Sequence, residues 1–197
     1  LIHEIGRAMR ETRAAGRKIL FVAGPAVIHT GCGQYLIRLI ESDFLQVLFG
    51  GNALAAHDIE SALYGTSLGV SLATGTVQTG GHEHHLRAIN EIRRAGSIAA
   101  AVEQGVLTKG VMHACVKYGV DYVLAGSIRD DGPLPGVITD VVAAQDAMRG
   151  ERDATGLAAV VMYRLLCQAR GRGYSRGRLT TTLKEVPPCR SSLRLGL

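Results

Sequence analysis

Short apolar runs that end near a glycine restrict the fold of this sequence more than any other feature. Three of them, KILFVAG (18–24), DFLQVLFG (43–50) and DYVLAGS (121–127), are continuously apolar rather than alternating. Such runs are typical of strands buried on both faces, as in a parallel sheet covered by helices. GLAAVVM at 156–162 is interpreted as a further strand.

Helical spacing between these runs completes an α/β pattern. Amphipathic periodicity predicts helices that alternate with the strands, at 2–16, 31–41, 52–64, 82–95, 106–118 and 136–149. The last helix is expected to turn Val137, Val141, Val142 and Ala144 inward. Residues 97–102 allow a short strand or the approach to the following helix. The prediction is a three-layer α/β domain with a mostly parallel sheet over residues 1–162.

Ligands of such sheets bind at the carboxyl ends of the strands. The loops expected there are 24–31, 50–53, 65–82 and 127–135. Residues 65–81, GTSLGVSLATGTVQTGG, are rich in Gly, Thr and Ser and predict a long ligand-facing loop with some helix. The four loops define where candidate binding residues are sought.

The charge of +5 is concentrated near the end of the chain. Residues 150–197 hold nine of the 22 Lys and Arg but three of the 17 Asp and Glu, so they carry +6 and the remainder −1. With no basic face on the folded part, no nucleic-acid partner is expected. Residues 163–197 lack periodicity. They are either a basic interaction tail or, as favoured here, not the natural continuation, through a frame slip or truncation.

The four cysteines and the hydropathy pattern bear on the compartment. Cys32, Cys115, Cys167 and Cys189 form no C-x-x-C pair, and no signal peptide precedes them. Reduced thiols and a cytoplasmic location are expected, with no membrane partner, since no apolar run reaches about 18 residues. The start at Leu1, directly in a helical pattern, suggests a fragment of a longer protein.

No familiar phosphate-binding motif is present. A G-x-G-x-x-G fingerprint after the first strand and a P-loop are both absent. Gly50-Gly51-Asn52-Ala53 joins a strand to a helix, which suits either a ligand approaching the helix amides or a tight turn with an Asn cap. Asp130-Asp131-Gly132 suits either a carboxylate that binds a ribose diol or an ordinary Asp-Gly turn.

Histidines gather at the start of one predicted helix. His82 and His85 share a face at i and i+3, with His84 between them. A metal would need a further ligand, such as His57, Asp58 or Glu60. A polar helix start is the commoner origin of such a cluster, so no metal is expected to bind.

Three longer segments resemble one family. GGNALAAHDIESALYGTSLG, GGHEHHLRAINEI and SIRDDGPLPGVITDVVAAQDAMR, starting at residues 50, 80 and 127, are similar to archaeal and cyanobacterial ornithine cyclodeaminases. These are also described by a domain conserved in lysine-ketoglutarate reductase/saccharopine dehydrogenase (LOR/SDH-like). The family domain also forms the C-terminal part of arginine dihydrolase/ornithine cyclodeaminase fusions. The resemblance covers roughly residues 1–162.

The resemblance implies a deoxyhypusine-synthase-like NAD-binding fold, which is Rossmann-like. It implies NAD as cofactor, ornithine as substrate, and proline and ammonia as products of transient hydride transfer. Asn52, Ala53 and Asp131 match positions where the family contacts NAD, and a full-length homo-oligomer is expected. Catalytic candidates, by loop position alone, are Asp58, His82 and His85.

One family motif is missing. A Thr-Met-Leu-His-Ser strand end is expected where Tyr163–Cys167 stands as YRLLC, so the domain is incomplete at its C-terminus and the fragment itself is expected to be inactive. A non-catalytic nucleotide-binding or regulatory module and a metal-dependent hydrolase remain as alternatives.

Overall fold

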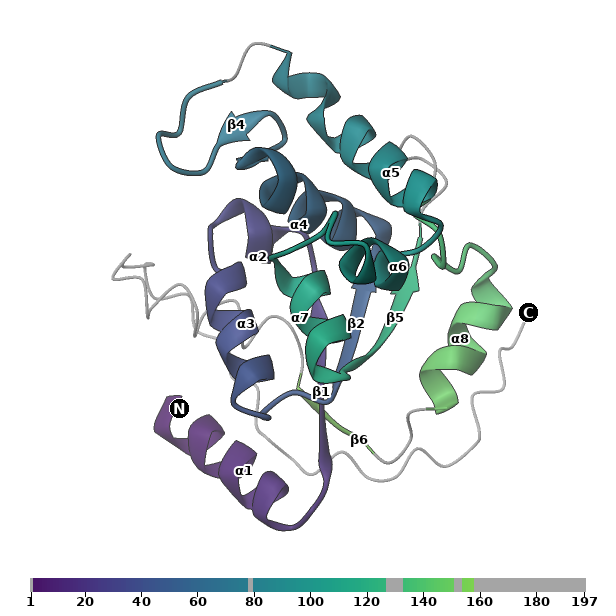
Figure 1. The fold of residues 1–197 in the computed structure, drawn as a ribbon. Coiled ribbons are helices and arrows are strands. Elements are labelled where there is room, and N and C mark those ends of the chain that lie inside the picture. Colours follow the sequence, from purple (N-terminus) through teal and green to yellow (C-terminus); the bar gives the residue numbers. More distant parts are fainter. Residues whose placement is uncertain (1, 78–79, 127–132, 151–153, 158–197) are drawn as a thin grey trace, which may run out of the picture.

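The computed structural model describes residues 2–77, 80–126, 133–150 and 154–157. Figure 1 shows a parallel sheet with helices packed around it. The strands are β1 (Lys18–Ala23), β2 (Val47–Gly51), β3 (Thr66–Ser67), β4 (Val70–Ser71), β5 (Asp121–Ala125) and β6 (Ala154–Leu157). The helices are α1 (Ile2–Ala14), α2 (Ala26–His29), α3 (Gly33–Glu41), α4 (Asn52–Tyr64), η1 (Gly81–Glu83), α5 (His84–Ala95), α6 (Ile98–Glu103), α7 (Val111–Tyr118) and α8 (Val141–Gly150).

The main sheet has the order β5-β2-β1-β6, and every pairing in it is parallel. Numbered by appearance in the chain, these strands run third, second, first, fourth. That is the order of the first four strands of a Rossmann fold, and the predicted α/β fold with a parallel sheet is confirmed. The switch point of the sheet therefore lies between β1 and β6.

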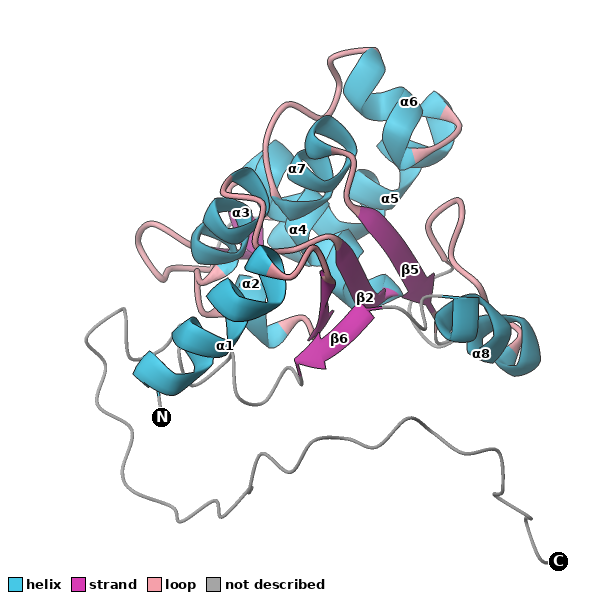
Figure 2. Cartoon of the chain, turned by 90° about the horizontal axis from the view of Figure 1, so that it is seen from below, coloured by secondary structure: helices cyan, strands magenta, loops and turns pink. Residues whose placement is uncertain are grey.

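These strands are continuously apolar because core residues pack against both faces of the sheet. On β1, Ile19 and Phe21 join the large core formed with the helices, while Leu20 packs on the other face with Phe49 of β2. Met148 of α8 lies against that second cluster. Figure 2 shows α8 apart from α3, α4 and α7, across the sheet.

Local structure moves one predicted boundary and decides one open alternative. The second strand begins at Val47 rather than at residue 43, because Asp43 adopts a left-handed φ of 57° that no strand tolerates. Residues 97–102 form no strand. They form α6, since the Ser97 hydroxyl accepts the Ala100 amide at 2.9 Å and caps a run of good helix formers.

The predicted inward face of the 136–149 helix is wrong at two positions. Asp140 accepts the Ala143 amide at 2.7 Å, so the helix starts at Val141 and its periodicity shifts. Val141 and Val142 are 68% and 63% exposed, while Val137 precedes the helix and packs against the core. The predicted loop at 65–81 holds the β3–β4 hairpin instead of helix.

Several expectations fall outside the described residues. Asp131 lies in the gap at 127–132, and the predicted tail 163–197 and most of the strand at 156–162 lie beyond residue 157. Cys32 and Cys115 are free and fully buried, and burial raises the pKa of the Cys115 thiol to about 12.

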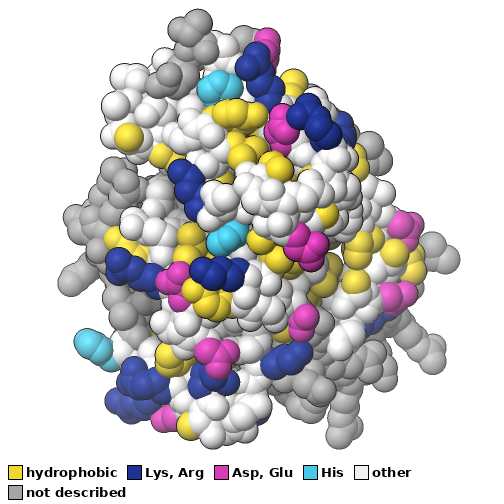
Figure 3. All heavy atoms as spheres, in the orientation of Figure 1, with side chains coloured by type: hydrophobic (Ala, Val, Ile, Leu, Met, Phe, Trp, Pro, Cys, Tyr) yellow, Lys and Arg dark blue, Asp and Glu magenta, His cyan; other side chains and the backbone are white. Residues whose placement is uncertain are grey.

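The surface charge and the helix lengths are relevant to the nucleic-acid and membrane partners considered above. On the face drawn in Figure 3, Lys and Arg side chains are interspersed with Asp and Glu. No helix in the described ranges is both long and apolar enough to cross a bilayer.

Candidate active site

The carboxyl rim of the sheet carries two helices that position the candidate residues. α2 follows β1, and α4 follows β2 directly, so both begin where a ligand of this strand order binds. α4 packs against α2, α5, α7 and the β3–β4 hairpin (Figure 1). Its side chains therefore meet segments from most of the described chain.

Asn52 is the first residue of α4 but does not cap it. The cap is Gly51, in an extended conformation, and makes no side-chain bond to the helix. The Asn52 side chain, 1% exposed, instead accepts the Leu134 amide on Oδ1 at 2.9 Å. The predicted Asn cap is thus wrong, because the amide group is drawn to a segment 82 residues away.

The other end of the Asn52 amide is unsatisfied. Its Nδ2 atom is buried and has no hydrogen-bond partner within the described part of the chain. A buried donor without an acceptor costs about 1–3 kcal/mol, so native proteins seldom keep one without a reason. Beside it, the α4 start, which includes half-buried Ala53, lacks a side-chain cap. The corner suits a ligand that supplies acceptor oxygens.

Glycines allow the close approach that forms this corner. A Cβ on Gly50 would lie 2.5 Å from Leu54 Cδ2, and one on Gly126 would lie 2.3 Å from Val137 Cγ1. Gly126 also sits beside Asn52, at 3.6 Å between the added Cβ and the Asn52 Cβ. Gly126 and the Asn52-bonded Leu134 bracket the segment that contains Asp131.

Farther along α4, Glu60 is fully buried and receives hydrogen bonds from four donors. They are His57 Nδ1 (2.9 Å), Thr66 Oγ1 (2.8 Å) and the amides of Leu68 (3.1 Å) and Gly69 (3.0 Å). Burial alone would raise the pKa of Glu60, but these bonds outweigh it and lower the pKa to about 2. Glu60 is therefore a buried carboxylate anion.

The two amides come from a turn that Glu60 holds in place. Leu68 and Gly69 both have positive φ, 52° and 72°, as in a two-residue type I′ hairpin. A leucine in that conformation is strained, so the bonds from the turn to the carboxylate help to offset the cost.

Further histidines lie around the His57–Glu60 pair. The His57 ring packs against His29 of α2, with ring centroids 4.7 Å apart, and against His85 of α5 at 6.1 Å. His29 Nδ1 is 2.6 Å from Ser67 Oγ, and burial followed by the proximity of His57 lowers the pKa of His29. Since Thr66 donates to Glu60, its oxygen accepts from His84 Nδ1 at 2.9 Å.

Asp58 has different neighbours. Its carboxylate accepts the Val111 and Met112 amides at 2.9 and 2.8 Å, which caps α7 from another helix. Burial, only partly offset by these two bonds, raises its pKa to about 6. Both oxygens are thus engaged in holding α7.

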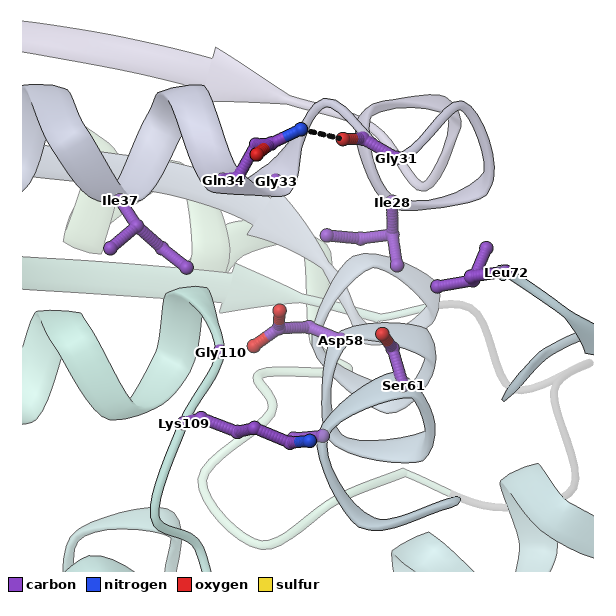
Figure 4. A pocket seen from close by; sticks show the side chains of 11 residues that line it. Ile28, Gly31, Gly33, Gln34, Ile37, Asp58, Ser61, Leu72, Lys109 and Gly110 are labelled. Carbon is purple, nitrogen blue, oxygen red and sulfur yellow. Dashed lines mark hydrogen bonds between the residues drawn. The ribbon is translucent and has the colours of Figure 1, made fainter. Parts of the chain in front are cut away.

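Asp58 also lines a pocket of about 390 Å³ between α3, α4 and the segment before α7. Figure 4 shows the Asp58 carboxylate turned toward Gly110 and the Lys109 side chain extended toward α4. Gln34 Nε2 donates to the Gly31 carbonyl at the upper wall, at 3.4 Å. The pocket lies beside α4 rather than at the Asn52 corner.

The structure brings some sequence candidates together and separates others. His85 joins His57 and His29, while Asp58 faces α7. His82 lies in η1, but its side chain falls outside the described set. Among the described side chains, no group of three His, Cys, Asp or Glu is arranged to hold a metal. The role of Glu60 was not foreseen, because its donors come from a hairpin that periodicity does not reveal.

A family profile described as "Arginine dihydrolase ArgZ-like, C-terminal, Rossmann fold" matches residues 3–173. The chain belongs to this family. The resemblance inferred from the three sequence segments is thereby confirmed.

Individual relatives agree with the family assignment. An ornithine cyclodeaminase of Methanocaldococcus jannaschii is 62% identical over 154 residues, which cover 76% of this chain and 36% of that protein. A solved LOR/SDH protein of Methanococcus maripaludis has a TM-score of 0.76 at 51% identity, covering 80% of this chain and 49% of the other. AgrE, solved as a ternary complex with ornithine and NAD+, has a TM-score of 0.76 at 48% identity, covering 80% and 24%.

The family member described here spans about a third of the length of such curated relatives, for example 36% of the M. jannaschii protein.

Proposed function

We propose that the chain is the NAD-binding part of an ornithine cyclodeaminase, which converts L-ornithine to L-proline and ammonia. Family membership and the ornithine and NAD+ bound by AgrE support this proposal. The observation that carries it is the buried Asn52 Nδ2, which has no partner among the described residues, at the start of α4 on the rim of a sheet with Rossmann strand order. A dinucleotide offers the acceptor oxygens that such a corner lacks.

Asn52, Ala53 and Asp131 would hold the dinucleotide. Asn52 would donate through Nδ2, and the first amides of α4, including that of Ala53, would face phosphate or ribose oxygens. Asp131 belongs to the segment bracketed by Gly126 and Leu134, and its carboxylate would accept from a ribose diol. When bound, NAD supplies a reversible acceptor for the hydride of the substrate Cα.

The protein must then orient Cα, keep the attacking δ-amine neutral and exclude water from the imine. Asp58, His82 and His85 remain candidates for moving protons. The contacts of Asp58 favour its role at the start of α7, whereas His85 lies in the histidine group around His57. A homo-oligomer of the full-length protein also remains a prediction.

One variant of Asn52 and one of Asp131 test the cofactor assignment, with NAD affinity measured by titration calorimetry. N52D keeps an oxygen for the Leu134 amide but removes the Nδ2 donor, so it should fold normally and bind NAD about 10- to 100-fold more weakly. D131A should weaken binding similarly. N90A, which alters an exposed asparagine on α5, is the matched control and should bind like wild type. Equal affinity in folded N52D and wild type would contradict the proposal.

A second measurement separates an enzyme from a nucleotide-binding module without chemistry of its own. L-Ornithine is added to the NAD-loaded chain, and proline is quantified. Proline formed in proportion to protein and NAD supports the cyclodeaminase. NAD binding without proline would show that this chain by itself acts as a nucleotide-binding module, as expected for an incomplete domain.

A further inference from the structure

Glu60 and His57 form a buried pair that the hairpin alone does not explain. Thr66 and the Leu68 and Gly69 amides already give the Glu60 carboxylate three donors. The imidazole of His57 adds a fourth at 2.9 Å, from a ring that is only 9% exposed. A carboxylate that orients an imidazole is the arrangement that proteins use to prepare a histidine for proton transfer.

The pairing determines which nitrogen of His57 titrates. Glu60 is ionised and can only accept, so His57 Nδ1 carries the proton of their bond. Within the described residues, the hydrogen bonds of His57 engage Nδ1 alone. Nε2 is then the atom that gains or loses a proton, and the Glu60 anion stabilises the imidazolium that results.

The pair also lies at the proposed active rim. His57 is five residues after Asn52 on α4, roughly 7.5 Å along the helix axis. Its ring lies at a tilt against His29 of α2, the helix that follows β1, and β1 borders the switch point of the sheet. One helix at the rim where a substrate of this strand order binds thus carries both the proposed NAD corner and an oriented imidazole, and their side chains leave the helix about 140° apart.

We propose that His57, oriented by Glu60, accepts the α-ammonium proton of ornithine through Nε2; this inference rests on the proposed function. The substrate N–H bond breaks, its electron pair stays on nitrogen, and a new Nε2–H bond forms. The Cα–H pair can then leave as hydride to NAD. His57 returns its proton to the same nitrogen, which leaves as ammonia after the neutral δ-amine has attacked the carbon. His57 Nε2 takes one proton from the δ nitrogen as the cyclic iminium forms, hydride returns to the ring carbon, and His57 gives that proton back to the ring nitrogen of proline.

Other titratable groups face His57 from each neighbouring element. They are Glu60 on its own helix, His29 from α2 and His85 from α5. His84 is connected to Glu60 through the Thr66 hydroxyl, which hydrogen-bonds to both. Burial and the nearby His57 lower the pKa of His29, which keeps His29 neutral when His57 is charged.

The first arm of the test observes the imidazole directly in the full chain. Nitrogen NMR of histidine-labelled protein should show His57 in the Nδ1–H form, assigned by the signal lost in H57Q. Adding L-ornithine to the NAD-loaded chain should shift the Nε2 resonance. E60Q should lose the preference for that tautomer, while H3N, at an exposed position on α1, should leave the signal unchanged.

The second arm measures the rate of reduced-nicotinamide formation and of proline formation. H57Q should bind NAD like wild type and react at least about 100-fold more slowly. H3N should react like wild type.

The outcomes separate the two proposals. Failure of the wild-type chain to bind NAD overturns the proposed function, and this inference falls with it. Normal NAD binding with equal turnover in H57Q overturns this inference alone. If NAD and ornithine bind without turnover, an unmoved His57 Nε2 resonance overturns it.

Discussion

Asp58 and Glu60 are buried carboxyl groups two positions apart on one helix, yet their pKa values are shifted in opposite directions. Asp58 faces the start of α7 and accepts two backbone amides, and its pKa is raised to about 6. Glu60 faces the β3–β4 hairpin and accepts from four donors, one of them an imidazole, and its pKa is lowered to about 2. Burial acts in the same direction on both, so the number and kind of donors decides whether the pKa ends above or below its usual value.

The largest expected effect follows from replacing the better-satisfied carboxylate. E60Q removes the charge and places an amide donor against at least one of the donors that now point at Glu60. Loss of one partner from a buried ionic network costs about 3–5 kcal/mol, so the free energy of unfolding should fall by that amount in urea titrations.

E11Q is the control for that substitution, since Glu11 is exposed on α1. It should change the unfolding free energy by less than about 0.5 kcal/mol. A loss in E60Q no larger than in E11Q would mean that the Glu60 network contributes little to stability.

The second effect is a pH dependence with opposite signs at the two sites. Because the pKa of Asp58 is raised from 3.8 to about 6, the stabilisation that Asp58 contributes is fully present below pH 3.8 and is lost as the pH rises through about 6. Because the pKa of Glu60 is lowered from 4.5 to about 2, the stabilisation that Glu60 contributes is fully present above pH 4.5 and is lost as the pH falls through about 2. From pH 3.8 to 6, wild type should lose up to about 3 kcal/mol relative to D58N.

Urea unfolding at several pH values measures the wild-type minus D58N difference, in which histidine titrations largely cancel. A difference that stays flat across the window would show that Asp58 ionises as easily in the folded chain as in the unfolded one.

The smallest effect tests how tightly Asp58 is packed against α7. Gly110 has a φ of +106°, and an added Cβ would lie 2.8 Å from Asp58 Oδ2. Gly105 also has a positive φ, +72°, but no neighbour within 4 Å of such a Cβ. G105A should cost about 1 kcal/mol for its backbone alone, and G110A about 2 kcal/mol or more. Equal thermal unfolding midpoints for the two variants would argue against close packing at Asp58.

Local sequence signals predicted the elements best where both ends carry strong cues. The predicted helix 52–64 coincides with α4, because Gly50 and Gly51 precede it and Gly65, with a φ of 70°, ends it. The 136–149 helix was predicted to start too early, since Asp140 captures the Ala143 amide and shifts which residues face inward. Apolar periodicity cannot register such a side-chain cap.

The site was predicted only where a motif carried it. Asn52 was singled out by its place after a strand, but its role as a cap was wrong, because the Leu134 amide that it binds lies 82 residues away. The Glu60 network was missed, although Glu60, His57 and His85 were each noticed as candidate metal ligands. Their real partners depend on a hairpin and on α2.

Apolar runs and glycines determined by themselves that this chain forms a layered α/β fold, because burying such runs leaves few alternatives. Tertiary structure alone decided which polar groups meet on α4, and therefore that the pKa of Glu60 is lowered while that of Asp58 is raised. A side chain brings its acid or base chemistry with it, but the donors that set its charge arrive from distant segments when the chain folds.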